Sequence, residues 1–306
     1  MKIFEPILLG LVQGLTEFFP VSSTGHLVII PFIFKWDYIP VYYTVILHFA
    51  TLLSLTTVFF KEIIIIIKSF FIGIFKKTAR NDKNFKLAIL IIIASIPAAL
   101  AGFLLEKYIE SFFSMPLFVG IFLLITAAVL VIGELRGNFI QKIRYLGSNN
   151  LKNENIYSYS DNQNYGMKSN INTKKPQFNY LIAFIVGIGQ AIAVLPGISR
   201  SGITISFARF FGIKREECVR FSFLLSIPVI LGSFLFEFYK SHSVIISSSF
   251  QILIYLLISF IFAYVSGFFA IKFLVKFSQN RNLNIFAIYC IVIAIIIFIL
   301  VAIKRF

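Results

Sequence analysis

The sequence predicts an all-α polytopic membrane protein with six transmembrane helices and two re-entrant helix hairpins, arranged as an inverted-topology repeat. Three observations predict this fold class. Of the 306 residues, 58% are hydrophobic and only 13% are charged, whereas soluble domains carry roughly 25% charged residues. Long uncharged stretches recur along the chain, and similar polar clusters interrupt two further apolar regions. A soluble fold and a disordered chain are both excluded by this composition, so we expect a single integral membrane domain over residues 1–306.

Six predominantly apolar segments are long enough for transmembrane helices, since about 20 apolar residues are needed to cross the hydrocarbon core. We interpret the charged residues 61–86 as a loop between the first two. Residues 146–177 are rich in Asn, Ser, Tyr and Lys and lack an apolar period, so we predict a disordered cytoplasmic loop there. The six predicted spans are residues 41–60, 87–105, 117–134, 219–238, 250–271 and 283–303.

Residues 3–34 and 180–211 are also apolar, but each region contains a polar interruption near its middle. We interpret each region as two half-helices joined by a polar turn, which makes a re-entrant hairpin. The first interruption consists of Glu17, Pro20, Ser22, Ser23, Thr24, Gly25 and His26, and the second consists of Pro196, Gly197, Ser199, Arg200, Ser201 and Gly202.

The two interrupted regions resemble each other. Similar broken helices in two halves of a membrane protein indicate a binding site near the midplane of an inverted repeat. The predicted halves are roughly residues 1–134 and 179–306. The matching positions are Gly10 and Gln13 with Gly187 and Gln190, at an offset of 177, and Pro20 and Ser23 with Pro196 and Ser199, at an offset of 176.

Basic residues are distributed unequally between the two sides of this predicted topology. Of the 28 Lys and Arg residues, Arg200 lies in the second interrupted region, six fall on one side and 21 fall on the other, in the segments 61–86, 135–178, 209–220 and 272–281. Because cytoplasmic loops are enriched in Lys and Arg, we assign the second side to the cytoplasm and both termini to the outside. Basic residues that lie between apolar segments, rather than along one face of a domain, argue against a nucleic-acid partner despite the net charge of +15.

Glu17 and Arg200 are the most informative candidate site residues. A charged side chain at the centre of a lipid-exposed helix costs about 2.5–3.5 kcal/mol on insertion scales, so both must face the protein interior or a wet cavity. One interpretation is an ion pair that only pins the two hairpins together. The other is a phosphate-binding site, because the helix N-terminus after each polar turn favours an anion and a guanidinium matches phosphate oxygens.

Hydroxyl groups and glycines around this pair extend the predicted phosphate site. Anion binding alone has no need of a carboxylate or an imidazole, so Glu17 and His26 indicate proton transfer or a metal ion in addition. We interpret His48, which lies within a span, as a core histidine near the site, and Cys218 and Cys290 as buried apolar residues. The hydroxyl and glycine candidates are Ser22, Ser23, Thr24, Gly25, Gly197, Ser199, Ser201, Gly202 and Thr204.

Three stretches of the sequence resemble the undecaprenyl-diphosphate phosphatase family, the bacitracin-resistance proteins. They run from Gln13 to His26, from Pro196 to Thr204 and from Phe221 to Pro228, and the similarity spans nearly the whole chain except residues 146–177. The resemblance implies an integral membrane enzyme that hydrolyses undecaprenyl diphosphate to undecaprenyl phosphate and inorganic phosphate, which recycles the lipid carrier of cell-wall precursors. It also implies a location in the bacterial cytoplasmic (inner) membrane, with the site open to the outer face.

For this reaction, chemistry assigns roles to the candidate residues. Arg200 would clamp the diphosphate and stabilise charge that develops at phosphorus, while Glu17 and His26 would handle protons or orient the nucleophile. The nucleophile is either Ser23 or an activated water, and the sequence does not choose between them. The predicted substrate-binding residues are Gln13, Thr24, Gly25, Ser199, Ser201 and Thr204.

The resemblance also implies a divalent cation, Mg²⁺ or alternatively Ca²⁺. The family carries Glu or Gln at the position of Gln13, and the Gln of this chain cannot act as a base or bring negative charge to a metal ion. Glu17 is therefore the candidate metal ligand, with substrate phosphates and water as the other ligands. The expected partners are a polyprenyl diphosphate lipid and membrane lipids, and a homodimer is compatible with this hypothesis.

A competing hypothesis is a lipid-phosphate flippase or an anion transporter. Paired broken helices in inverted repeats are a transporter design, and such a protein would share the phosphate site. Glu17 together with His26 favours hydrolysis, although proton-coupled transport uses the same residue types.

Overall fold

The computed structural model describes residues 3–37, 39–112, 115–157 and 177–304, and over these ranges its regular structure is entirely helical. Apolar composition and the absence of strands in this part of the chain agree with the predicted all-α membrane fold. The helices are α1 (Phe4–Phe18), α2 (Ser23–Phe34), α3 (Val41–Val58), α4 (Phe60–Phe75), the 3₁₀ helix η1 (Lys77–Asn81), α5 (Lys83–Phe112), α6 (Pro116–Tyr157), α7 (Tyr180–Ile192), α8 (Arg200–Arg209), α9 (Arg215–Ile246), α10 (Phe250–Asn280) and α11 (Asn284–Lys304).

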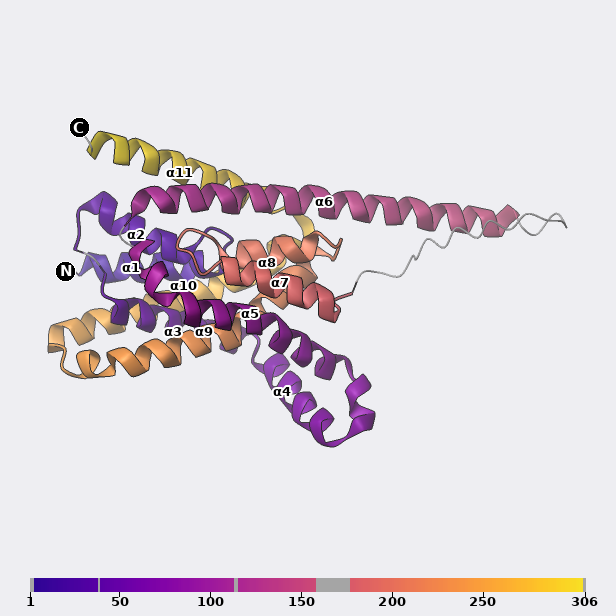
Figure 1. Cartoon of the computed structure of the whole chain (residues 1–306), viewed down its shortest axis with the longest axis horizontal. Coiled ribbons are helices and arrows are strands. Elements are labelled where there is room, and N and C mark those ends of the chain that lie inside the picture. Colours follow the sequence, from indigo (N-terminus) through magenta and orange to yellow (C-terminus); the bar gives the residue numbers. More distant parts are fainter. Residues whose placement is uncertain (1–2, 38, 113–114, 158–176, 305–306) are drawn as a thin grey trace.

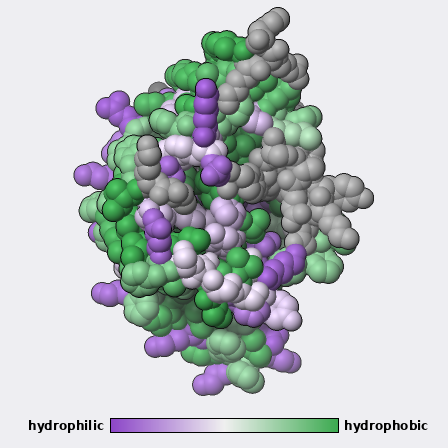
Figure 2. Space-filling model, turned by 90° about the vertical axis from the view of Figure 1, so that its left-hand side faces the viewer, coloured by the Kyte–Doolittle hydropathy of each residue, from purple (hydrophilic) through white to green (hydrophobic). Residues whose placement is uncertain are grey.

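Six of these helices are long and apolar enough to cross a membrane, namely α3, α5, α6, α9, α10 and α11. They coincide with the six predicted spans, which are confirmed. Many of their large apolar side chains face outward, as Leu104, Phe269 and Ile288 do with 61–68% exposure. Figure 2 shows hydrophobic residues over much of the outline of the end that bears both termini. So much outward apolar surface suits contact with lipid rather than water.

The prediction of a loop over residues 61–86 is wrong. The chain forms α4 and η1 there, and α5 already begins at Lys83. The isoleucine-rich run of α4 packs against α5, with Ile66 and Gly73 buried. This packing stabilises a helix although Lys61, Glu62 and Lys68 interrupt its apolar sequence. Asp82 starts α5 by accepting the backbone N–H groups of Asn84 and Phe85 at 2.8 and 3.1 Å. The N–H of Phe85, with that of Asn84, holds the pKa of the Asp82 carboxyl below its usual range.

The predicted polar loop at 146–177 is also corrected over its first part. Helix α6 continues from the membrane span through Tyr157, as the long projecting helix of Figure 1. An existing helix propagates at little cost because its nucleus is already formed, and no proline interrupts the chain between Pro116 and residue 157. Residues 158–176 of the predicted loop lie outside the described residues.

Each predicted broken region consists of two short helices. Helices α1 and α2 contact each other, as do α7 and α8. Helix α1 also packs along α10, and α7 packs along α5, so both short pairs lie within the bundle of long helices. In Figure 1 the two chain termini lie at one end of the bundle, while η1 and the start of α7 lie at the other.

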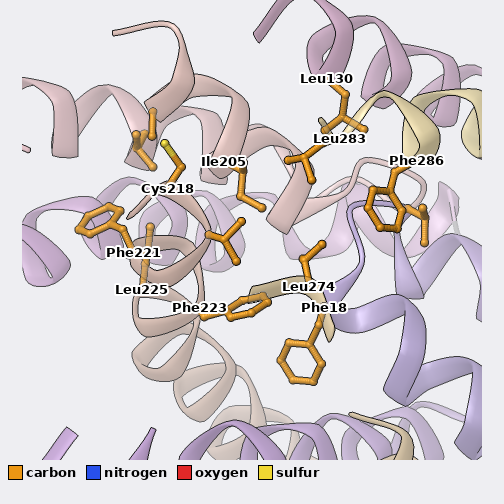
Figure 3. Packing of buried hydrophobic residues seen from close by; sticks show 14 of the residues in the cluster. Phe18, Leu130, Ile205, Cys218, Phe221, Phe223, Leu225, Leu274, Leu283 and Phe286 are labelled. Atoms are coloured by element: carbon orange, nitrogen blue, oxygen red, sulfur yellow. The ribbon is translucent and has the colours of Figure 1, made fainter. Parts of the chain in front are cut away.

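Aromatic packing anchors the break between α1 and α2. Phe18 is fully buried and meets the Phe223 ring edge-on, with ring centroids 5.5 Å apart (Figure 3). Phe19 packs against Phe286 of α11 at 5.3 Å. Such pairs add roughly 0.5–1.5 kcal/mol each beyond the burial of their area. They fix the backbone on the C-terminal side of Glu17.

A buried ionic cluster fixes the far end of α8. Arg215 Nε donates to Glu134 at 2.9 Å, and Arg209 Nη2 lies 3.6 Å from the same carboxylate. Arg209 also donates to the amide oxygen of Asn138 at 2.8 Å. Glu134 and Arg209 are 2% and 1% exposed, so breaking the cluster would leave a buried charge without compensation. The cluster therefore joins α6 to α8 and α9.

Candidate functional site

A capping serine begins the second helix of each short pair. Ser22 Oγ accepts the backbone N–H of Gly25 at 3.2 Å, and Ser199 Oγ accepts that of Gly202 at 3.1 Å. These N-caps satisfy helix donors that would otherwise lack partners. They match Ser22 with Ser199 at an offset of 177, which corrects the predicted match of Ser23 with Ser199. Arg200 thus stands at the position of Ser23, and each is the first residue of its helix.

The two breaks meet through backbone and hydroxyl groups. Ser22 Oγ accepts a second hydrogen bond from the N–H of Gly197 at 3.1 Å, and Ser201 Oγ donates to the carbonyl of Phe19 at 3.2 Å. A Cβ added to Gly25 would lie only 3.1 Å from the Cα of Gly197. Glycine at both positions permits this close approach, and it brings the starts of α2 and α8 together.

Glu17 is the centre of the site. Its Oε1 accepts a 2.7 Å hydrogen bond from Arg200 Nη2, and its Oε2 accepts bonds of 2.6 Å from Ser23 Oγ and 3.1 Å from Gln13 Nε2. The residue is only 7% exposed, so these partners replace water as donors to the carboxylate. Four predicted site residues from opposite halves of the chain are therefore brought together: Gln13, Glu17, Ser23 and Arg200.

His48 belongs to this cluster, in contrast to its interpretation as a core histidine near the site. Its Nε2 lies 3.6 Å from Glu17 Oε2. Its Nδ1 bonds the carbonyl of Thr44 at 2.7 Å, and because a carbonyl only accepts, Nδ1 carries a proton. Nε2 therefore either holds a lone pair or, in the cation, a proton directed at the site. The sequence signal was weak because His48 stands alone within an apolar span, far from both polar clusters.

His26 is bonded elsewhere. Its Nδ1 bonds the carbonyl of Ser22 at 2.7 Å, and its Nε2 lies 2.8 Å from the hydroxyl of Tyr289, a residue that sequence reasoning missed. Ser22 has a φ of 68°, a conformation that is uncommon outside glycine. The imidazole thus holds the carbonyl of the strained residue that precedes Ser23.

The remaining predicted hydroxyls surround the breaks. Thr24 lies 3.3 Å from Ser22 Oγ, and the hydroxyls of Ser199 and Ser201 are 3.1 Å apart. Thr204 donates to the Arg200 carbonyl at 2.8 Å and lies 2.6 Å from Ser222 Oγ, so its hydroxyl is bonded to α8 and α9. Binding of substrate by these groups stays a prediction.

Thr126 of α6 was not predicted from the sequence. It donates to the carbonyl of Gly197 at 3.2 Å and accepts the N–H of Ser199 at 3.0 Å. Both bonds support the second break where it has no helical hydrogen bonds of its own. An uncharged span gives no local sign of such a role.

Two buried polar atoms of the cluster have no hydrogen-bond partner among the described residues. They are Arg200 Nη1 and Gln13 Oε1. An unsatisfied buried donor costs about 1–3 kcal/mol or more when charged, which a bound anion at Arg200 would relieve. No group of three or more His, Cys, Asp or Glu side chains is placed to hold a metal ion in the part of the chain that the structure describes.

Comparison with known proteins gives a consistent result over almost the whole chain. The family model described as "Bacitracin resistance protein BacA" matches residues 6–296. The chain is 38% identical to an undecaprenyl-diphosphatase of Methanosphaera stadtmanae, with 98% of both chains covered. It is 37% identical to an undecaprenyl-diphosphatase of Thermosipho africanus, covering 95% of this chain and 98% of the relative. It is 33% identical to undecaprenyl-diphosphatase 1 of Shouchella clausii, covering 98% and 96%.

Proposed function

The chain belongs to the bacitracin resistance protein BacA family, and from this premise we propose that it is a membrane-embedded undecaprenyl-diphosphatase. It hydrolyses undecaprenyl diphosphate to undecaprenyl phosphate and inorganic phosphate. The observation that carries the proposal is the cluster of Ser23, Glu17 and Arg200, with a nucleophile, a base and a phosphate-binding cation within hydrogen-bond distance. Hydrolysis of a phosphoric anhydride uses all three.

Arg200 binds the terminal phosphate in this mechanism. One nitrogen, Nη2, is held by Glu17, and the other, Nη1, is buried without a partner among the described residues. The free N–H groups of Nη1 donate to oxygens of the terminal phosphate and stabilise the charge that develops there. The guanidinium position is set by the carboxylate, so little reorganisation is needed when the substrate binds.

Ser23 is the nucleophile that the geometry favours. Its hydroxyl donates to Glu17 Oε2 at 2.6 Å, within the range typical of a nucleophile and its base. As Ser23 Oγ bonds to the terminal phosphorus, its proton passes to Glu17, and the bond from phosphorus to the bridging oxygen breaks. Undecaprenyl phosphate leaves, and water then hydrolyses the phosphoserine to release inorganic phosphate and regenerate Ser23.

The two histidines support these steps from different sides. We propose that His48, whose side chain is 26% exposed and whose Nε2 faces Glu17, exchanges the transferred proton with solvent. The role proposed for His26 is to position Ser23, because its Nδ1 bonds the carbonyl of Ser22, the preceding residue. Direct proton handling by His26 would have to pass through the hydroxyl of Tyr289.

A divalent cation, Mg²⁺ or alternatively Ca²⁺, remains part of the proposal. Glu17 and the unpartnered amide oxygen of Gln13 are the oxygen ligands that this cluster offers. When bound, the cation would neutralise negative charge on the diphosphate. Both Glu17 oxygens already accept hydrogen bonds. Glu17 and Gln13 therefore fit a cation that is held mainly by substrate oxygens and water, as Mg²⁺ often is.

We also propose the placement of the molecule in the membrane. The pairs α1–α2 and α7–α8 are re-entrant hairpins, inverted relative to each other, in a protein of the cytoplasmic (inner) membrane whose site opens to the outer face. Support comes from the matched N-caps of Ser22 and Ser199 and from the unequal distribution of basic residues. A homodimer stays a prediction.

Family membership disfavours the alternative of a flippase or an anion transporter. Purified protein in detergent, supplied with a C55 polyprenyl diphosphate, should release inorganic phosphate, because detergent micelles leave no second compartment for transport. A chelator should lower the rate if the cation accompanies the substrate. Absence of phosphate release by folded protein, with Mg²⁺ and with Ca²⁺, would overturn the proposed function.

A further inference from the structure

A basic groove lies where α3 meets α4, beside the neighbouring ends of α9 and α10. Its volume is about 800 Å³, and none of the residues around Glu17 lines it. Helix α3 ends at Val58 and α4 begins at Phe60, and the two helices run in different directions (Figure 1). The lining combines four basic side chains, Lys61, Arg220, Lys272 and Lys276, with the apolar side chains of Phe59 and Val275.

The groove carries an excess of positive charge that the protein does not neutralise. Its one carboxylate, Glu62, is already paired with Arg220 at 2.8 Å. Among the described residues, Lys61, Lys272 and Lys276 form no ion pair within 4 Å. Lys272 instead lies over the ring of Phe268, 4.1 Å from its centroid. Three ammonium groups around one open space are complementary to an anion.

The position of the groove indicates which class of anion it suits. Val58 is the last residue of the span formed by α3. Arg220 is the second residue of the predicted span 219–238, and Lys272 directly follows the predicted span 250–271. The basic side chains therefore lie at the membrane boundary on the end of the molecule that carries most Lys and Arg. Apolar walls beside the basic groups suit an amphiphile, whereas a small water-soluble anion gains nothing from them.

We propose that this groove binds the phosphate head group of an anionic glycerophospholipid from the leaflet beside the basic loops, with its acyl chains along the apolar wall. The lysines hold the phosphate, and the Arg220–Glu62 pair keeps the beginning of α4 against α9. A lipid held there would stabilise the junction of α3, α4, α9 and α10. The inference rests on membrane insertion and does not depend on the proposed diphosphatase activity.

Titration of the purified protein with phosphatidylglycerol, followed by native mass spectrometry and thermal unfolding, tests the proposal. Each basic residue near an anionic lipid surface contributes about 1 kcal/mol, which is roughly fivefold in affinity. Lys272→Gln/Lys276→Gln should therefore bind phosphatidylglycerol roughly 25-fold more weakly than wild type. The matched control is Lys68→Gln/Lys142→Gln, which removes two exposed lysines outside the groove and should bind as wild type does.

Phosphatidylcholine and inorganic phosphate serve as the other two ligands. Wild type should gain thermal stability from phosphatidylglycerol and little from either of these. Equal losses of binding in both double variants would show general attraction to a basic surface and overturn the proposal. So would equal stabilisation by phosphatidylcholine, or by inorganic phosphate alone. Phosphate release from the diphosphate substrate is not used in this experiment, so its outcome is separate from that of the proposed function.

Discussion

Glu17 illustrates how a single buried carboxylate can organise a site inside a membrane protein. Isolated in an apolar interior, its charge would be strongly unfavourable. Here Arg200, Ser23 and Gln13 donate to its two oxygens, and His48 lies 3.6 Å away. Removal of any donor leaves the carboxylate less well compensated, so substitutions around Glu17 act on both the charge and the geometry of the cluster.

Replacement of Arg200 tests phosphate binding. We expect Arg200→Ala to lower kcat/KM by about 10³-fold or more, since loss of one such donor typically costs about 10²–10³ and Glu17 also loses its partner. Arg200→Lys keeps the charge but not the planar fork, so a smaller loss is expected. Phosphate release in detergent is the measurement, and Arg281→Ala, an exposed loop residue, is the control. Activity of Arg200→Ala near that of wild type would remove Arg200 from the site.

Replacement of Ser23 separates the two nucleophiles. If Ser23 attacks phosphorus, Ser23→Ala should lose about 10³-fold or more in kcat, and rapid acid quenching of wild type should trap a phosphoprotein that the variant lacks. Glu17→Gln should also be impaired, because an amide cannot accept the serine proton. Ser95→Ala is the control, since that hydroxyl bonds only within its own helix. A Ser23→Ala rate within about twofold of wild type would favour water as the nucleophile.

At this scale the sequence predicted the residues that stand in polar clusters and missed those that stand alone. Glu17, Ser23 and Arg200 were identifiable because charges and hydroxyls are costly in apolar segments. Tyr289 and Thr126 gave no signal, because each is ordinary in a span and reaches the site only through the packing of α11 and α6. Bonds between side chains 263 residues apart, as for His26 and Tyr289, depend on tertiary structure that no local pattern contains.

At the scale of elements, the two helix breaks work as one unit. Each break ends one short helix and starts another with a serine cap, so N–H groups and dipole ends of α2 and α8 are directed to the same region. Gly197 permits the contact, since its φ of 106° is unfavourable for other residues and its Cα lies against Gly25. The geometry of the cluster at Glu17 therefore depends on the backbone of both breaks.

Gly197→Ala should disturb the site without removing any functional group. An alanine Cβ would be strained by the backbone and would lie 2.8 Å from the Val119 carbonyl oxygen, which costs roughly 1–3 kcal/mol for the backbone alone. We expect a lower Tm and a fall in kcat of up to about 10²-fold, the effect of misplacing groups by about 1 Å. Gly232→Ala is the control, because a Cβ there meets no atom within 4 Å. Equal behaviour of the two variants would contradict the structural contact.

The helices were predicted correctly where the length of an apolar run alone decides that a helix forms. Runs of about 20 predominantly apolar residues determined all six spans, because the hydrocarbon core sets their length. Helix α4 was missed because Lys61, Glu62 and Lys68 interrupt its apolar run, although α5 supplies a partner for it. The extension of α6 to Tyr157 was missed because composition alone does not show that a helix continues beyond the membrane.

At the scale of the whole molecule, the two ends of the helix bundle also differ in charge. The termini lie at one end of the bundle and η1 at the other (Figure 1), and the segments richest in Lys and Arg adjoin the end with η1. Because the positive-inside rule acts on loops near spans, this asymmetry predicts that η1 is cytoplasmic. The loop between α9 and α10 then lies outside.

Cysteine labelling in intact cells tests this orientation. The native thiols of Cys218 and Cys290 are buried, so an introduced cysteine at an exposed position reports its own location. A membrane-impermeant maleimide should label Ser247→Cys, between α9 and α10, in intact cells, and should label Thr78→Cys, in η1, only after permeabilisation. Both residues are exposed in the structure, so a difference between them reflects the membrane. Labelling of Thr78→Cys in intact cells would reverse the orientation, and it would move the basic groove to the outer leaflet while leaving the cluster at Glu17 unchanged.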